Sequence, residues 1–140
     1  MMQFYVVRPE VPGQLGENTV LDRTGERLRV SHLHYAFDGW LGDELITSHP
    51  AFAATTTLAE KFLAAGLTGV QLRDMEVTRS EQFEELYPDR TLPDFVELVV
   101  TGAAGVQDFG IDDQNDLVLS QPAVDILNAT GPLDTEIIPR

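Results

Sequence analysis

Two histidines, followed by carboxylates, are the residues of this chain whose spacing best suits metal chemistry. His32 and His34 are two positions apart in LRVSHLHYAF, and on a strand this spacing places both imidazoles on one face. Asp38 and Asp43 follow them, and His49 adds a third imidazole. Two imidazoles and a carboxylate can ligate a transition metal. A metal-binding module or metal-dependent enzyme using His32, His34 and Asp38 is therefore one hypothesis, although an H-x-H pair also occurs in strands that bind no metal.

The tract DFGIDDQND carries four aspartates, Asp108, Asp112, Asp113 and Asp116. Calcium prefers several oxygen ligands from one loop, but the tract lacks the glycine at the sixth position and the glutamate at the twelfth that an EF-hand needs. We therefore interpret it as a polar hairpin loop with solvated acidic side chains.

Trp40 is the only tryptophan, and it lies between glycines and acidic residues in FDGWLGD. A large aromatic side chain in such a loop can anchor a protein partner, or it can fill the core beneath the loop. The segment EQFEEL offers a second acidic surface, which can also be a solvated helix face. The candidate partner-binding residues are Trp40, Asp38, Asp43, Glu81, Glu84, Glu85, Asp108, Asp112, Asp113 and Asp116.

Sequence signatures of catalysis are missing. The chain has no cysteine, which removes thiolate catalysis and cysteine metal sites. It contains no G-x-S-x-G elbow, G-x-G-x-x-G turn or P-loop. The only lysine, Lys61, falls on a predicted helix surface, and the adjacency of Ser48 and His49 does not make a triad. We therefore expect no catalytic residues and no cofactor, and binding rather than catalysis.

The chain is strongly acidic, with 23 acidic and 9 basic residues and a net charge of −14. Residues 101–139 contain no basic residue at all. Such a surface repels nucleic acid and anionic membranes, and it accelerates encounter with a basic partner. The same acidity can serve solubility alone. Because Arg8, Pro9 and Glu10 interrupt the apolar start and no run approaches a membrane span, we expect a cytoplasmic protein.

The pattern of apolar residues predicts one α+β domain over residues 1–140, with a mixed or antiparallel sheet of about six short strands and about three short helices. Predicted strands cover residues 2–8, 28–37, 52–55, 69–78, 95–102 and 117–120, and further extended segments cover residues 18–22 and 135–138. We expect Thr55 or Thr56 to cap the first helix, Ser80 the second and Ser120 the third. Gly66 is expected to end the first helix and Gly131 the third.

A strand–helix–strand pattern occurs twice, at an offset of 65 residues. Ser120 falls on Thr55, and Gly131 falls on Gly66. A duplicated unit is one explanation. Because few side chains match, we favour the alternative that short capped helices between strands share this pattern anyway.

Several segments together resemble a family of small bacterial immunity proteins of polymorphic or contact-dependent toxin systems, with myxobacterial members. They are FYVVRPE, LGENTVLD, LHYAFDGWLGD, LTGVQLRDMEVTRSEQFEELYP and LPDF, spanning Phe4 to about Phe95. The resemblance implies a cytoplasmic protein that binds and neutralises a cognate toxin domain, and it supplies no catalytic residues. The acidity adds the expectation that the toxin is basic. A subunit of a larger assembly, including a homo-oligomer, is a further alternative.

Overall fold

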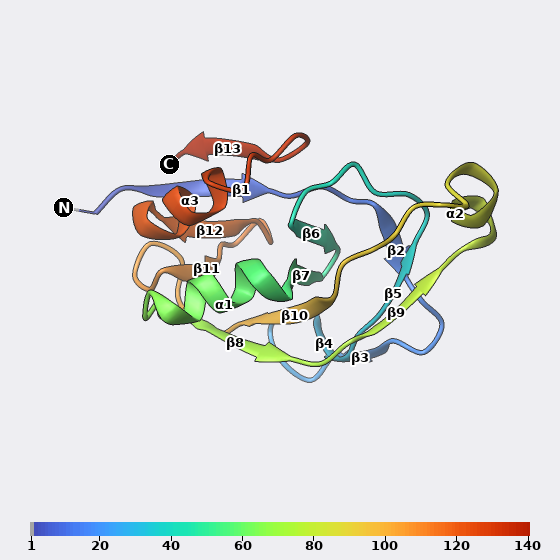
Figure 1. Ribbon diagram of the computed structural model, residues 1–140. Coiled ribbons are helices and arrows are strands. Elements are labelled where there is room, and N and C mark those ends of the chain that lie inside the picture. The colour runs from blue at the N-terminus through green and yellow to red at the C-terminus, as the bar shows by residue number, and fades with distance from the viewer. Residues whose placement is uncertain (1) are drawn as a thin grey trace.

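The computed structural model describes residues 2–140, which form thirteen short strands and three helices (Figure 1). The helices are α1 (Thr56–Ala64), α2 (Glu81–Leu86) and α3 (Gln121–Asn128). Sheet A has the order β11 (Phe109–Ile111), β12 (Leu117–Ser120), β1 (Phe4–Arg8) and β13 (Glu136–Pro139). Sheet B has the order β6 (Leu45–Ser48), β7 (Ala51–Thr55), β10 (Phe95–Val100) and β8 (Val70–Arg73).

Two smaller sheets complete the fold. Sheet C has the order β2 (Gly13–Leu15), β5 (His34–Phe37) and β9 (Glu76–Arg79), and β3 (Val20–Asp22) with β4 (Arg29–His32) forms a two-stranded ribbon. All strand pairs are antiparallel except β5 with β9. The protein is therefore an α+β fold of short strands, as the sequence predicts.

The helices begin and end where local chemistry places them. Thr55, Ser80 and Ser120 are the N-caps, and each hydroxyl accepts the backbone N–H three residues later at 3.2–3.4 Å. Gly66 and Gly131 follow α1 and α3 with φ of 70° and 71°, a left-handed conformation that glycine adopts without strain.

Sheets A and B are two copies of one unit. In the first unit, the hairpin β6–β7 leads into α1 and then β8, and β7 and β8 flank the antiparallel strand β10. In the second unit, the hairpin β11–β12 leads into α3 and then β13, and β12 and β13 flank the antiparallel strand β1. The central strand of the first unit follows the helix in sequence, whereas that of the second is the first strand of the chain.

The register of the two units agrees residue by residue. Thr55 pairs with Phe95 in the first unit, and Ser120 pairs with Phe4 in the second. On the other side of the central strand, Leu98 pairs with Leu72, and Val7 pairs with Ile137. Both capping residues also donate their backbone N–H to the residue just before the hairpin. Thr55 donates to the carbonyl of Glu44 at 2.8 Å, and Ser120 donates to the carbonyl of Asp108 at 2.9 Å. The two units thus share their topology and register as well as their pattern of capped helices, which favours the duplicated unit over the alternative that the side-chain identities favoured.

One core joins the two units. α1 and α3 pack against each other in front of the sheets (Figure 1). Leu58 and Phe62 of α1 and Leu127 of α3 lie fully or almost fully buried in this core. The rings of Phe62 and Phe109 meet edge to face with centroids 5.0 Å apart.

A second core lies on the face of sheet B opposite α1. Sheet C covers this face, and the aromatic rings of Tyr35, Phe37 and Phe95 follow one another at centroid distances of 4.7 and 5.2 Å. Phe83 of α2 is buried in the same core, which fixes α2 to sheet C. α2 lies at the end of the molecule opposite both chain termini (Figure 1).

Two predicted strands are each divided in the structure. Residues 28–37 form β4 and β5, which separate at Leu33, and residues 69–78 form β8 and β9, which separate at Asp74 and Met75. In each case the second half joins sheet C.

None of the three helices in residues 2–140 has the length and apolar character needed to cross a membrane.

Candidate functional site

Trp40 lies in the loop that connects β5 to β6. Its indole Nε1 donates to the backbone oxygen of Asp43 at 2.8 Å, and its ring meets Phe95 edge to face at 5.9 Å. The guanidinium of Arg90 lies 5.7 Å from the ring centroid. Trp40 therefore closes the second core, and as a partly buried residue it keeps some surface at the exterior.

Asp43 has a structural role in the same loop. Its side chain is buried, and its two oxygens accept the backbone N–H of Leu133 at 2.6 Å, the N–H of Asp134 at 2.9 Å and the hydroxyl of Thr135 at 2.7 Å. It fastens the segment before β13 to the Trp40 loop. Since Asp43 is 2% exposed and its oxygens accept three hydrogen bonds, the expectation that it contacts a partner is not supported.

Glu10 supports the loop from the other side. It is 2% exposed, and it accepts the backbone N–H of Leu41 at 2.7 Å and that of Asp43 at 3.1 Å. Burial raises the pKa of Glu10, and these two hydrogen bonds offset only part of the rise. Two buried carboxylates therefore hold the Trp40 loop in place, which favours a surface that is preformed rather than induced.

An open hollow, here called the Trp40 hollow, lies between this loop and α2. Its lining includes Val11, Asp38, Trp40, Leu41, Gln82, Tyr87 and Asp134. Val11 and Leu41 are 62% and 55% exposed, and Leu86 at the end of α2 adds a third exposed apolar side chain. Surface apolar side chains gathered around a partly exposed tryptophan are typical of protein-binding sites.

Glu10, Asp38 and Asp134 line the Trp40 hollow, and the adjoining helix α2 carries further carboxylates. Arg79 neutralises Glu84 with an Nη2 to Oε2 distance of 2.8 Å. The other nearby carboxylates have no ion pair with any described residue; they are Asp38, Glu81, Glu85, Asp89 and Asp134. The sequence-predicted residues Trp40, Asp38, Glu81, Glu84 and Glu85 thus gather at one end of the molecule.

The aspartates of the second tract lie elsewhere, on and between β11 and β12, and are mostly engaged. Asp108 accepts hydrogen bonds from Ser120 and from Thr68, and Asp116 pairs with Arg8 at 3.3 Å. Asp112 accepts two backbone N–H groups of its own loop. Only Asp113 is exposed without a hydrogen bond to another described residue. The structure does not bring this tract to the Trp40 hollow (Figure 1).

The proposed metal ligands do not form a site. Among residues 2–140 there is no group of three or more His, Cys, Asp or Glu side chains placed to hold a metal ion. Both imidazoles face Glu76, at 3.5 Å for His32 and 3.9 Å for His34. However, His34 is buried, and its ring nitrogens already contact the N–H of Asn18 and the hydroxyl of Thr78. The grouping with Asp38 does not occur.

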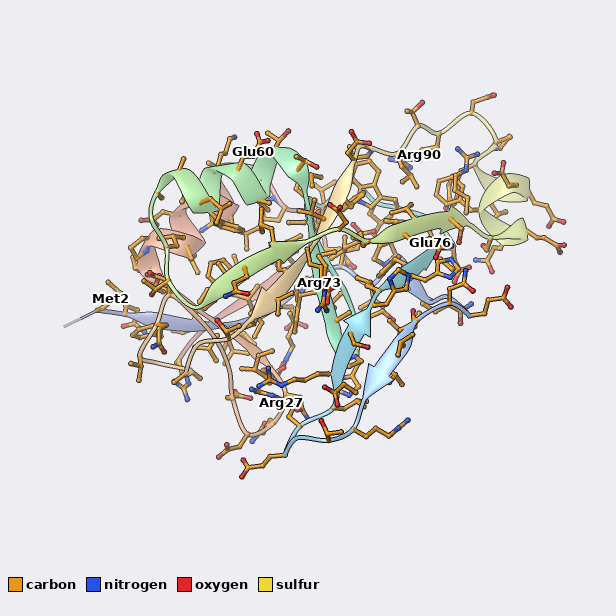
Figure 2. The ribbon with its side chains drawn as sticks, turned by 90° about the horizontal axis from the view of Figure 1, so that it is seen from below. Met2, Arg27, Glu60, Arg73, Glu76 and Arg90 are labelled. Carbon is orange, nitrogen blue, oxygen red and sulfur yellow. The ribbon has the colours of Figure 1, made fainter. Side chains whose placement is uncertain are left out.

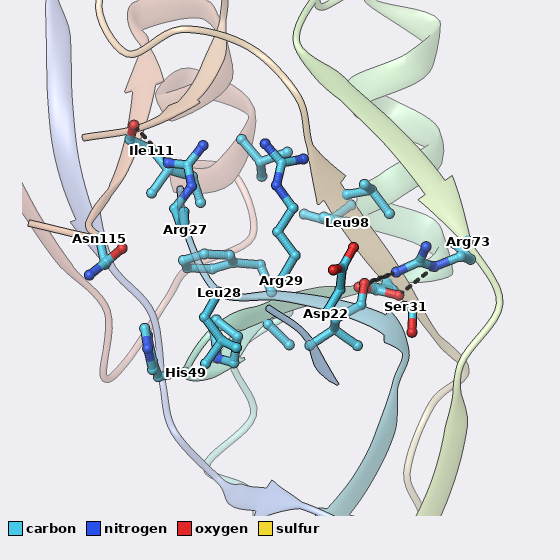
Figure 3. A pocket seen from close by; sticks show the side chains of 17 residues that line it. Asp22, Arg27, Leu28, Arg29, Ser31, His49, Arg73, Leu98, Ile111 and Asn115 are labelled. Carbon is cyan, nitrogen blue, oxygen red and sulfur yellow. Dashed lines mark hydrogen bonds and ion pairs between the residues drawn. The ribbon is translucent and has the colours of Figure 1, made fainter. Parts of the chain in front are cut away.

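A second cavity was not predicted from the sequence. It has a volume of about 260 Å³ and lies between the β3–β4 ribbon and sheet B (Figure 3). We call it the arginine cavity, because Arg27, Arg29 and Arg73 line it, three of the nine basic residues of the chain. Asp22, Glu97 and His49 are the other ionisable residues in its lining. Spread over more than forty positions, these arginines form no sequence motif.

The three arginines are engaged to different extents. Arg73 forms a two-bond ion pair with buried Glu97 at 2.9 and 3.1 Å and donates to the Val30 carbonyl at 2.6 Å (Figure 3). Arg27 donates one hydrogen bond, to the Ile111 carbonyl at 3.1 Å. The guanidinium of Arg29 has no hydrogen-bond partner among the described residues.

Comparison of the chain with protein-family models, with curated proteins and with solved structures finds no match. The functional interpretation therefore depends on the geometry of the Trp40 hollow and the arginine cavity, together with the sequence resemblance.

Proposed function

We propose that this protein is a cytosolic immunity protein that binds a basic toxin domain through the Trp40 hollow and α2, and thereby neutralises it. The observation that supports this most is the combination of exposed apolar side chains with unpaired carboxylates at one end of the molecule. The identity of the partner as a toxin rests on the sequence resemblance.

The chemistry of the hollow suits a protein partner. Leu41 and Val11 offer apolar area, and the Trp40 ring between Phe95 and Arg90 is held at a fixed orientation. Interface energy concentrates on a few such anchors surrounded by polar residues. Because the loop is preformed by Glu10 and Asp43, binding loses little conformational entropy.

The carboxylates around the hollow suit a basic partner. Unpaired acidic groups at the rim accelerate association with a positively charged surface and contribute less to the dissociation rate. The overall charge of −14 acts in the same direction. The binding rate is therefore expected to fall as salt is added.

The direct test is binding and protection with a candidate toxin domain, taken from a neighbouring gene that encodes a secreted protein with a toxic C-terminal domain where one is found. Leu41→Arg places a charge on the exposed apolar centre and is expected to weaken binding by about thirtyfold or more, the scale of an interface anchor. Val106→Arg is the matched control, since Val106 is 73% exposed on the β10–β11 connection and lies outside the hollow. The measurement is the dissociation constant together with survival of cells that express the toxin.

A charge-reversal pair tests the acidic rim separately. Glu85→Lys on α2 is expected to slow association and reduce its salt dependence, whereas Glu60→Lys on the exposed side of α1 should leave both unchanged (Figure 2). If the unmodified chain neither binds nor protects, the proposed function is wrong. If Leu41→Arg and Val106→Arg weaken binding equally, the assignment to the Trp40 hollow is wrong.

A further inference from the structure

The arginine cavity lies apart from the Trp40 hollow and shares no lining residue with it. The ribbon supplies Arg27 and Arg29, whereas sheet B supplies Phe52 and Glu97. In a chain with 9 basic and 23 acidic residues, three arginines against two carboxylates in one lining reverse the local balance of charge.

The two carboxylates in the lining have hydrogen-bond partners other than Arg27 and Arg29, although Asp22 is the strand partner of Arg29. Asp22 accepts the backbone N–H of Thr24 at 2.9 Å and its hydroxyl at 2.6 Å, and Glu97 is held by Arg73. Neither Arg27 nor Arg29 forms an ion pair within 4.0 Å with any described residue. Arg27 keeps most of its five N–H donors and Arg29 keeps all of its own.

The two guanidinium groups extend to the same side in Figure 3, and that of Arg27 lies next to Ile111. Arg27 lies at the end of the bend between β3 and β4, and Arg29 is the first residue of β4. Two guanidinium groups presented together match the oxygens of a carboxylate or a phosphate, with which arginine forms paired hydrogen bonds.

The rest of the lining is largely apolar. Leu28, Val30 and Phe52 contribute to it, and Asn115 and His49 add polar groups at its margin. Ligand sites combine an apolar surface with a few polar groups that fix orientation. A volume of about 260 Å³ is at the small end for such sites, so the occupant is a small molecule with roughly one ring.

We propose that the arginine cavity binds a small organic anion, whose carboxylate or phosphate group contacts Arg27 and Arg29 and whose apolar part lies against Leu28, Val30 and Phe52. The outer hollow next to it contains Asp112 and Asp113. Asp112 accepts two backbone hydrogen bonds within its own loop, and Asp113 is exposed to solvent. At a salt concentration of 0.1 M, charges more than about 10 Å away are largely screened, so the net charge of the protein does not prevent anion binding at this site.

Calorimetric titration of the full chain tests the proposal with phenyl phosphate and benzoate as probes, and with inorganic phosphate and benzyl alcohol as the separate halves. We expect saturable one-to-one binding of at least one of the two ring-bearing anions, and the stronger of them identifies the head group. Each half alone is expected to bind more weakly. The proposal is overturned if neither ring-bearing anion binds saturably, or if benzyl alcohol binds as well as they do.

Two matched variants locate the binding. Arg29→Gln is expected to weaken it by about tenfold, the loss of a charge-assisted hydrogen bond, without lowering the melting temperature, because the Arg29 guanidinium bonds to no described residue. Arg23→Gln removes the same charge from the exposed β3–β4 turn outside the cavity and should leave binding unchanged. Equal weakening by both variants would mean that only the overall charge matters, and it would overturn the site.

Discussion

The two copies of the strand–helix unit are alike on the face that packs against the helices and differ on the opposite face. On the helix side, Leu98 of the first unit corresponds to Val7 of the second, and both lie in the common core. On the opposite side, the paired positions Glu97 and Arg73 correspond to Val6 and Ile138. The first unit therefore carries an ion pair with one buried partner, Glu97, where the second carries two aliphatic residues.

The difference follows from what covers each sheet. Sheet C and the β3–β4 ribbon pack on the face of sheet B opposite α1, and the ribbon covers the arginine cavity there, whereas Ile138 on sheet A remains 36% exposed. Both candidate sites use segments outside the two units, namely residues 9–44 and 74–94. The duplicated framework thus provides stability, and the added segments provide the surfaces that can bind.

The largest effect is expected where the units share one core. Phe62 of α1 and Leu127 of α3 occupy equivalent positions and are 0% and 1% exposed. Phe62→Ala should lower the free energy of unfolding by about 4 kcal/mol and Leu127→Ala by about 3 kcal/mol, because each removes apolar contacts and leaves a cavity. Chemical denaturation measures both. Two separate unfolding transitions would contradict a common core.

A smaller effect is expected from the ion pair that distinguishes the units. Arg73→Ala leaves buried Glu97 without a cation and should cost about 2 kcal/mol, less than a fully buried pair, because the Arg73 side chain is 39% exposed. The double variant Arg73→Ile with Glu97→Val copies the residues of the second unit and should recover most of the stability.

The exposed pair between Arg8 and Asp116 serves as the control, and Arg8→Ala should change the denaturation midpoint very little. If the double variant is as unstable as Arg73→Ala, the two faces are not interchangeable, and the ion pair has a role that aliphatic packing cannot replace.

The sequence predicted the features that depend on neighbouring residues. Ser80 and Ser120 cap helices because a hydroxyl at that position satisfies a backbone N–H of the first turn, and this chemistry is visible in a short window. The division of residues 28–37 at Leu33 was missed, although the alternation changes phase there, from Leu28 and Val30 to Leu33, Tyr35 and Phe37. The short strands β2, β6 and β11 were missed as well, since three or four residues carry little pattern.

The candidate sites were predicted only in part, for a related reason. Trp40 stands out by type, and its neighbouring carboxylates share its segment. Burial depends on the tertiary structure, so the structural roles of Asp43 and Glu10 could not be read from their positions. The arginine cavity requires residues from β8 and from the ribbon, which only the folded chain brings together.

The smallest loss of stability is expected from removing the N-cap hydroxyl of α1 or of α3. Thr55→Ala and Ser120→Ala should each cost about 1 kcal/mol through loss of the capping hydrogen bond. The Ser120 hydroxyl also donates to Oδ1 of Asp108 at 2.6 Å. Burial alone would raise the pKa of Asp108, but the hydrogen bonds from Ser120 and Thr68 outweigh it and lower the pKa below its ordinary value of 3.8.

This lowered pKa makes the effect of Ser120→Ala depend on pH. A carboxylate whose pKa is lower in the folded state stabilises the protein above its unfolded pKa, and this stabilisation is lost as the pH falls through the folded pKa. The destabilisation by Ser120→Ala should therefore be largest at neutral pH and should shrink below about pH 4. In an Asp108→Asn background this pH dependence should disappear. Denaturation curves across this pH range measure the difference in free energy of unfolding between the unmodified protein and Ser120→Ala. A difference that stays constant with pH would show that Ser120 acts on α3 alone.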